Sequence, residues 1–149
     1  MLNSHPHHRR LPDLLADGLR AARFWRWLLL GLVVVVGWLA LQPAPPASIS
    51  LGWDKLNHGA AFAALAFSAW LGHAASARRR VVALLALWVS GGLIEVAQTW
   101  LPPRQGDWAD LLGDTVGLAV GTALAVGLLR LLPPGTGRPA QRDGAAPRS

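Results

Sequence analysis

The chain has 149 residues, of which 52% are hydrophobic and 15% are charged, and it contains no cysteine. A soluble globular domain has about 25% charged residues, so the composition favours a membrane protein. The lack of cysteine excludes disulfides, thiolate metal sites and cysteine nucleophiles. The net charge of +6 suggests nucleic-acid binding, but the basic residues flank apolar segments instead of clustering with aromatic residues. We therefore predict no nucleic-acid partner.

The first predicted element is a helix over residues 24–42, preceded by a polar and basic segment. We expect residues 1–23 to form a disordered cytoplasmic tail, although its His5, His7 and His8 also resemble a metal-binding tract. A cleaved signal peptide is an alternative for the apolar run, because arginines precede it and small residues follow it. The long leading region and the prolines at 43, 45 and 46 argue against cleavage.

Three more apolar runs follow a linker rich in proline and serine, and we predict helices over about 56–75, 81–101 and 110–132. Each run is close to the ~20 residues that cross a hydrocarbon core as a helix. Residues 133–149 are rich in Gly, Pro and Arg and are expected to form a second disordered tail. The predicted fold class is therefore all-α, a four-helix transmembrane bundle over residues 24–132.

The arginines predict the orientation of this bundle. Of the 14 Lys and Arg residues, all but Lys55 and Arg104 lie before the first run, between the second and third, or after the fourth. Basic loops stay on the cytoplasmic side, so both termini are predicted to be cytoplasmic. The linker before the second run and the loop before the fourth are then extracytoplasmic. The expected location is a bacterial cytoplasmic (inner) membrane, with the lipid bilayer as a partner.

Five of the eight acidic residues belong to this predicted outer end. Asp54 and His58 are one helical turn apart, and so share a face. Glu95 stands about 9 Å inside its helix end, where a carboxylate facing lipid is costly. The tentative catalytic residues are Glu95, His58 and Asp110, and the candidate binding residues are Asp54, Lys55, Gln98, Arg104, Asp107 and Asp114.

Each of these residues also has a structural explanation. Asp54 and Asp107 are good helix caps, and His58 could serve only as a hydrogen-bonding residue between helices. Glu95 could form a salt bridge to Arg104 or Lys55. If these roles were independent, however, the residues would not all need to lie on one side of the membrane. Their joint placement favours a single polar site.

Small residues recur every four positions in the last run, at Gly113, Gly117 and Gly121. Such spacing lets helix backbones approach closely in lipid. We expect packing within the chain, with a dimer face as the alternative, and the oligomeric state stays open.

The order of these residues resembles the VanZ-like family of small bacterial membrane proteins over residues 50–125. The matching pattern is Asp54-Lys55-x-x-His58, Glu95-x-x-Gln98, Pro102-x-Arg104, Asp110, and a small polar residue with Gly117 and Gly121. The family usually has Asn where this chain has Asp114. The resemblance implies an integral membrane protein with a link to glycopeptide (teicoplanin) resistance, and it implies no particular reaction.

Three functions are compatible with these features. The first is binding of a cell-envelope, lipid-linked or peptidoglycan-related ligand at the polar site. The second is an enzyme acting on such a substrate, with Glu95 or Asp110 as general base, His58 oriented by Asp54, and Lys55 and Arg104 binding an anionic group. A divalent metal is a variant of this second hypothesis, but no residue is assigned as a metal ligand and no cofactor is identified. The third is a small-solute transporter.

Overall fold

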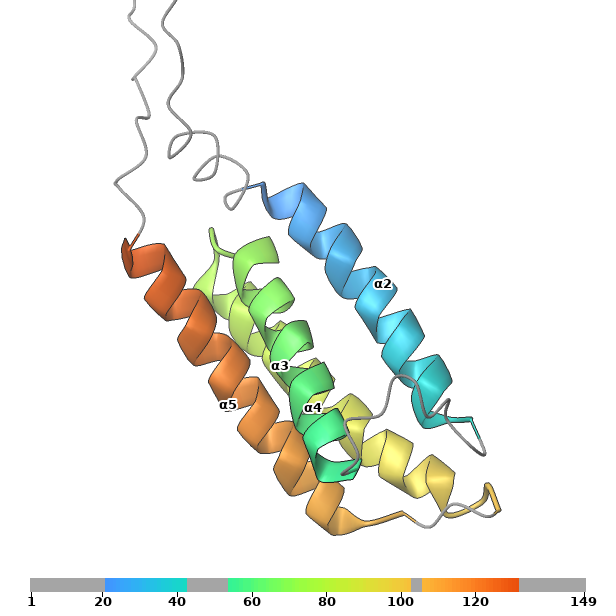
Figure 1. The fold of residues 1–149 in the computed structure, drawn as a ribbon. Coiled ribbons are helices and arrows are strands. Elements are labelled where there is room, and N and C mark those ends of the chain that lie inside the picture. The colour runs from blue at the N-terminus through green and yellow to red at the C-terminus, as the bar shows by residue number, and fades with distance from the viewer. Residues whose placement is uncertain (1–20, 43–53, 103–105, 132–149) are drawn as a thin grey trace, which may run out of the picture.

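The computed structural model describes residues 21–42, 54–102 and 106–131 of the chain. Within these residues it contains only helices, which confirms the predicted all-α class (Figure 1). The helices are α2 (Ala22–Ala40), α3 (Asp54–Gly72), α4 (Ala77–Gln98) and α5 (Trp108–Leu131). Residues 1–20 of the first predicted tail, the second predicted tail and the linker between α2 and α3 lie outside the described residues, whereas Ala22 and Arg23, predicted as tail, begin α2.

Each helix begins two to four residues earlier than predicted, and the clearest case is α4. The hydroxyl of Ser76 accepts a hydrogen bond from the backbone N–H of Arg79 at 3.4 Å, so Ser76 caps α4 and its three arginines belong to the first turn. A capping serine satisfies an N–H that the helix leaves unpaired. Hydropathy alone places the start after the arginines, because it does not register the cap.

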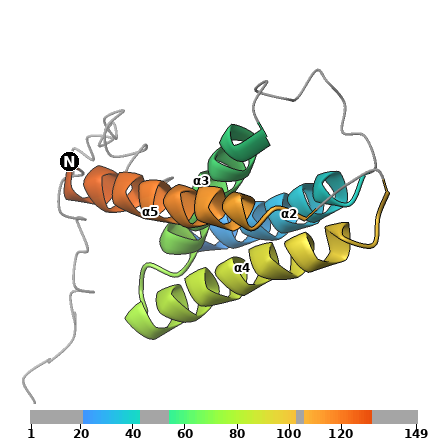
Figure 2. The ribbon, with the colours of Figure 1, turned by 90° about the horizontal axis from the view of Figure 1, so that it is seen from below.

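The helices alternate in direction, and hydrogen bonds at both ends tie them together. Arg26 Nε donates to the carbonyl oxygen of Gly72 at 2.7 Å, which joins the start of α2 to the end of α3. Gln98 Nε2 donates to the carbonyl oxygen of Ala40 at 2.9 Å, which joins the ends of α4 and α2. In Figure 1 the axes of the four helices run in roughly one direction, and in Figure 2 α3 crosses behind α5.

This alternation separates the charged residues into two groups. The arginine end contains the starts of α2 and α4 and the ends of α3 and α5, with Arg23, Arg26, Arg78, Arg79, Arg80 and Arg130. The acidic end contains the starts of α3 and α5 and the end of α4, with Lys55, His58, Glu95, Asp107, Asp110 and Asp114. Between the two groups, the described helices carry no ionisable side chain.

The closest packing in the molecule is between α3 and α5, which contact through the glycine stripe. A Cβ atom at Gly117 would overlap the carbonyl oxygen of Gly59, and one at Gly121 would overlap that of Ala63. The predicted close approach of backbones therefore occurs within the chain. It fixes the starts of α3 and α5 beside one another.

The hydrophobic core is small and centres on α3, whose Phe62, Leu65, Ala66 and Ala69 are buried with Leu87 of α4 and Leu118 of α5. By contrast, large apolar side chains cover the outside of the other helices, including Val34 of α2, Leu93 of α4 and Val116 of α5. A soluble monomer rarely exposes so much contiguous apolar surface. This distribution suits a lipid environment.

Three of the described helices, α2, α4 and α5, are long and apolar enough to cross a membrane. The remaining helix, α3, has the same length as α2, 19 residues. Its first turn and the start of its second contain Asp54, Lys55, Asn57 and His58, which lower its mean hydropathy. It also packs against all three other helices, most extensively against α5 and α2. A helix enclosed by protein needs less hydropathy than one that faces lipid.

Candidate functional site

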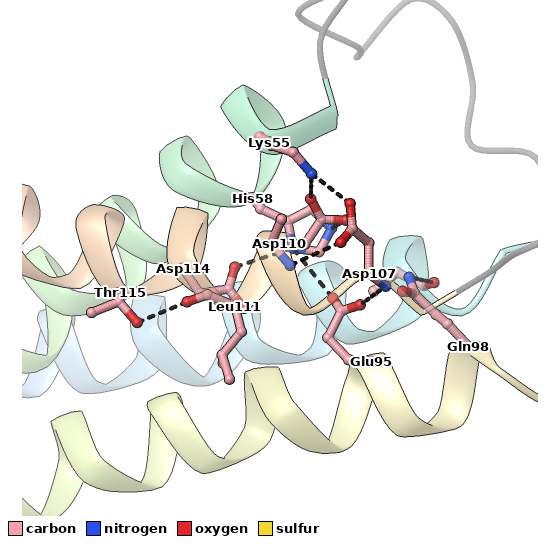
Figure 3. Close-up of polar contacts among 11 residues, drawn as sticks. Lys55, His58, Glu95, Gln98, Asp107, Asp110, Leu111, Asp114 and Thr115 are labelled. Atoms are coloured by element: carbon pink, nitrogen blue, oxygen red, sulfur yellow. Dashed lines mark hydrogen bonds and ion pairs between the residues drawn. The ribbon is translucent and has the colours of Figure 1, made fainter.

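Three helices meet at the acidic end, where α4 and α5 supply buried carboxylates and α3 supplies a histidine (Figure 3). Glu95 of α4 is 1% exposed, and Asp110 and Asp114 of α5 are 4% and 0% exposed. Burying an ionised group costs several kcal/mol unless partners compensate. The partners of each carboxylate therefore decide what this cluster can do.

His58 of α3 lies among all three buried carboxylates. Its Nδ1 is 3.1 Å from Asp114 Oδ1, at hydrogen-bonding distance. The same nitrogen is 3.9 Å from Glu95 Oε1, and Nε2 is 3.9 Å from Asp110 Oδ2. The side chain of His58 is 11% exposed. A histidine between several carboxylates has the composition of an acid–base site or a metal site.

Glu95 is held by one of its two oxygens. Oε2 accepts a hydrogen bond from the backbone N–H of Asp107 at 2.8 Å, so the loop before α5 fixes the carboxylate. Gly106 makes this possible, because a Cβ there would overlap the backbone oxygen of Glu95. The other oxygen, Oε1, is buried and has no hydrogen-bond partner among the described residues. It faces His58.

Asp114 occupies space that a glycine provides. A Cβ on Gly91 of α4 would overlap Asp114 Oδ2 and lie 3.1 Å from the ring of Phe62. Asp114 Oδ2 is likewise buried and without a hydrogen-bond partner in the described part of the chain. The glycine in α4 therefore lets a carboxylate of α5 enter the bundle beside His58.

Lys55 of α3 spans the mouth of the cluster. Its Nζ donates to Asp107 Oδ2 at 2.6 Å and to Asp110 Oδ1 at 3.1 Å. The hydrogen bond from this ammonium lowers the pKa of the Asp107 carboxyl below its usual value, and a backbone N–H bond from Ala109 contributes as well. Asp107 thus pairs with Lys55 and, through its Oδ1, caps the start of α5 at 2.9 Å from Ala109 N.

The other predicted residues divide into two groups. Gln98 is buried but donates to the end of α2, which gives it a structural contact outside the carboxylate cluster. Asp54 is the first residue of α3, and the placement of its side chain is not described. Arg104 lies outside the described residues, so its predicted role and the possible Glu95–Arg104 salt bridge stay predictions.

Two contributors were missed at the level of sequence. The backbone N–H of Asp107 binds Glu95, and Trp88 Nε1 donates to the hydroxyl of Thr115 at 3.1 Å, linking α4 to α5 beside Asp114. Residue spacing does not show that the backbone N–H of a loop will bind a side chain of the preceding helix. A tryptophan in an apolar run is usually interpreted as lipid-facing.

The electrostatics of the cluster are unbalanced. Among the described side chains of this end, four carboxylates face one lysine and one histidine. Lys55 is already bonded to two of those carboxylates and is not free to bind an anion. The cluster is therefore suited to proton exchange or to binding positive charge.

The comparisons with known proteins add no identity. No protein-family model, no curated protein and no solved structure matches this chain.

Proposed function

We propose that this chain is a VanZ-like, four-span protein of a bacterial cytoplasmic membrane that binds a cell-envelope or lipid-linked ligand at its acidic end. In this proposal both termini are cytoplasmic, α3 is the fourth span, and the acidic end faces the extracytoplasmic side. The orientation is supported by the positive-inside rule, because the described arginines gather at the opposite end.

One observation carries the proposal. Three carboxylates and a histidine from three helices are buried together at one end of an otherwise apolar bundle. Burying an ionised carboxylate costs several kcal/mol unless partners compensate, and one oxygen each of Glu95 and Asp114 has no hydrogen-bond partner among the described residues. Purely structural helix contacts in lipid are made with small residues and neutral hydrogen bonds at lower cost. Polar groups arranged at such expense in stability indicate a binding site.

The lipid-linked class of ligand is supported by a second feature. An apolar cavity of about 320 Å³ lies between α2, α3 and α4, lined by residues that include Gly37, Phe62, Leu87 and Ala97. Ala97 is two positions from Glu95 on α4, so the cavity reaches toward the acidic end. In the proposed complex it takes the hydrocarbon chain of the ligand, and the polar head meets the carboxylate cluster.

A catalytic role is the second candidate, and the surroundings of His58 favour it over transport. Asp114 bonds to one ring nitrogen, while the other faces Asp110. A carboxylate that orients a histidine opposite a second acid is an arrangement used for general acid–base catalysis. Transport gains no such support, because the described helices carry no ionisable residue between their two ends.

The test compares two histidines at opposite ends of α3. A deletion strain is complemented with wild type, Glu95→Gln, His58→Gln or His73→Gln. The last is the matched control, since His73 follows α3 at the arginine end. Teicoplanin sensitivity and the cell lipid profile are measured at equal membrane levels of protein. We expect both site variants to resemble the deletion and the control to resemble wild type. Full complementation by both site variants would refute the proposal.

A further inference from the structure

We infer that His58, Glu95 and Asp110 form a binding site for a divalent transition-metal cation at the acidic end. The cation site itself is argued from the geometry of the cluster. Its role in ligand binding, given below, rests on the proposed function.

The three side chains converge from three helices. Each offers one ligand atom, and the three atoms lie within 4.8 Å of one another. Bonds to zinc from nitrogen and oxygen are about 2.1 Å long, so two ligands of a tetrahedral zinc ion are about 3.4 Å apart. The observed limit of 4.8 Å exceeds that separation by about 1.4 Å, so binding requires the side chains to close in by rotation within their rotamer wells.

A buried carboxylate oxygen without a hydrogen-bond partner is available as a ligand for a cation. Glu95 is 1% exposed, its Oε1 has no hydrogen-bond partner among the described residues, and this atom is 3.9 Å from His58 Nδ1. The other oxygen is anchored by Asp107 N–H, which prevents the carboxylate from turning away. Leaving a buried acceptor unsatisfied costs about 1–3 kcal/mol, and more for a charged group. A cation would satisfy it.

Asp114 supports the histidine as a metal ligand. A carboxylate only accepts hydrogen bonds, so the contact between Asp114 Oδ1 and His58 Nδ1 places the hydrogen on Nδ1. The lone pair of Nε2 is then available, on the side that faces Asp110. Metal-binding histidines usually donate their other N–H to a carboxylate in this way, which fixes the ring orientation.

The charge of the cluster favours the same conclusion. With Lys55 protonated and His58 neutral, as a metal ligand has to be, the four carboxylates outnumber the one cation by three negative charges. A divalent cation reduces that excess to one. One nitrogen and two carboxylate ligands suit zinc or manganese better than calcium or magnesium, which prefer oxygen alone.

Three protein ligands leave at least one coordination position open. Zinc sites with three protein ligands and an open position are typical of centres that bind substrate or water. If the proposed function holds, the cation would present positive charge to a phosphate or carboxylate group of the envelope ligand. This explains how a site rich in carboxylates, with Lys55 already paired, can recognise an anionic headgroup.

The experiment measures metal binding in the full-length protein, purified in detergent through a tag without histidine. The three tail histidines are first replaced (His5→Ala, His7→Ala and His8→Ala), since they offer a competing site. After chelator treatment, the protein is titrated with Zn²⁺ and bound metal is measured by mass spectrometry. We expect about one equivalent bound, and more than about tenfold weaker binding for Glu95→Gln and His58→Gln. His73→Gln, the matched control, keeps the affinity of the parent.

A second measurement applies even if the site variants fail to fold. In the background that also carries His73→Gln, His58 is the only histidine left of the five in the chain. Cu²⁺ bound to that protein should show nitrogen hyperfine coupling in its electron paramagnetic resonance spectrum. No bound zinc above the detergent blank, unchanged affinity in folded Glu95→Gln and His58→Gln, or a copper spectrum without nitrogen coupling would each overturn the inference. Because no envelope ligand is used, such a failure would leave the proposed function standing. Full complementation by the site variants, which would refute the proposed function, would in turn leave the metal site standing.

Discussion

Arginine side chains and carboxylate side chains occupy opposite ends of the helices, and the two groups differ in their exposure to solvent. At the arginine end, Arg23, Arg78, Arg79 and Arg130 are exposed, and Arg80 lies 4.5 Å from the ring centre of Trp70. At the acidic end, Glu95, Asp110 and Asp114 are buried around His58. Exposed charge at a helix end needs no binding partner, because water solvates it. Buried charge does, and this difference separates an end whose charges are solvated from an end that is a candidate binding site.

The largest expected effect comes from separating α3 and α5, which would disrupt both ends at once. Gly121→Ala forces a Cβ into the backbone of Ala63, which cannot rotate away. We expect a loss of about 3 kcal/mol in the free energy of unfolding, the upper end of typical overpacking. Unfolding in detergent followed by helical circular dichroism measures it.

The matched control for this change is Gly127→Ala in the same helix, where an added Cβ meets no atom within 4 Å. Alanine also loses less backbone entropy than glycine on folding, so this variant should be as stable as wild type or slightly more so. Equal destabilisation by both substitutions would show that the glycine stripe does not join the helices.

The next effect is restricted to the acidic end. Gly91→Ala places a Cβ against Asp114 Oδ2 and the Phe62 ring, so the carboxylate must leave its position beside His58. We expect a loss of about 2 kcal/mol in unfolding free energy, together with loss of the envelope phenotype. Complementation and unfolding assays measure the two effects.

Its neighbour supplies the control. A Cβ at Gly92 meets nothing within 4 Å, so Gly92→Ala should retain both stability and function. If Gly91→Ala behaved in the same way, the burial of Asp114 would be irrelevant to the site.

A third substitution tests the cavity without affecting either charged end. Gly37→Leu should fill the apolar cavity, because Gly37 lines it and has open space around its Cβ position. We expect unchanged stability but a weaker lipid-dependent phenotype, because the hydrocarbon chain is excluded. Gly31→Leu, also on α2 with open space but away from the cavity, is the control. Identical lipid profiles for the two variants would show that the cavity does not bind the hydrocarbon chain of the ligand.

The smallest expected effect is the pH dependence of the exposed pair at the mouth of the site. The pKa of Asp107 is lowered by Lys55, so the pair stabilises the folded state above the unfolded carboxyl value of 3.8. This contribution is lost as the pH falls through the lower folded pKa. Thermal midpoints of wild type should therefore approach those of Asp107→Asn in strong acid. A difference between the two that is independent of pH would contradict the pairing.

The sequence was sufficient to predict the class of fold and the end that carries the site. Apolar runs of membrane length predicted the helices, and the one-turn spacings and outer-end placement of His58, Glu95 and Asp110 predicted their convergence. The orientation and the VanZ-like resemblance stay predictions.

The details that the sequence could not provide are those that depend on tertiary contacts. Lys55 was expected to bind an anionic ligand, and instead it is bonded to Asp107 and Asp110. The carboxylates outnumber the cations there, and which of them lies nearest depends on how α3 packs against α5. Gln98 likewise contacts Ala40, 58 residues away along the chain. Helical spacing assigns residues to a face, but it does not identify the partner across the interface.

The central proposal is that the acidic end faces the extracytoplasmic side of the membrane and that the arginine end faces the cytoplasm. The chain has no cysteine, so single cysteines can be placed at will. Trp100→Cys marks the acidic end at an exposed side chain, and Ala77→Cys marks the arginine end. We expect an impermeant maleimide to label Trp100→Cys in intact cells and Ala77→Cys only after permeabilisation. Labelling of Ala77→Cys in intact cells, with Trp100→Cys protected, would contradict the account.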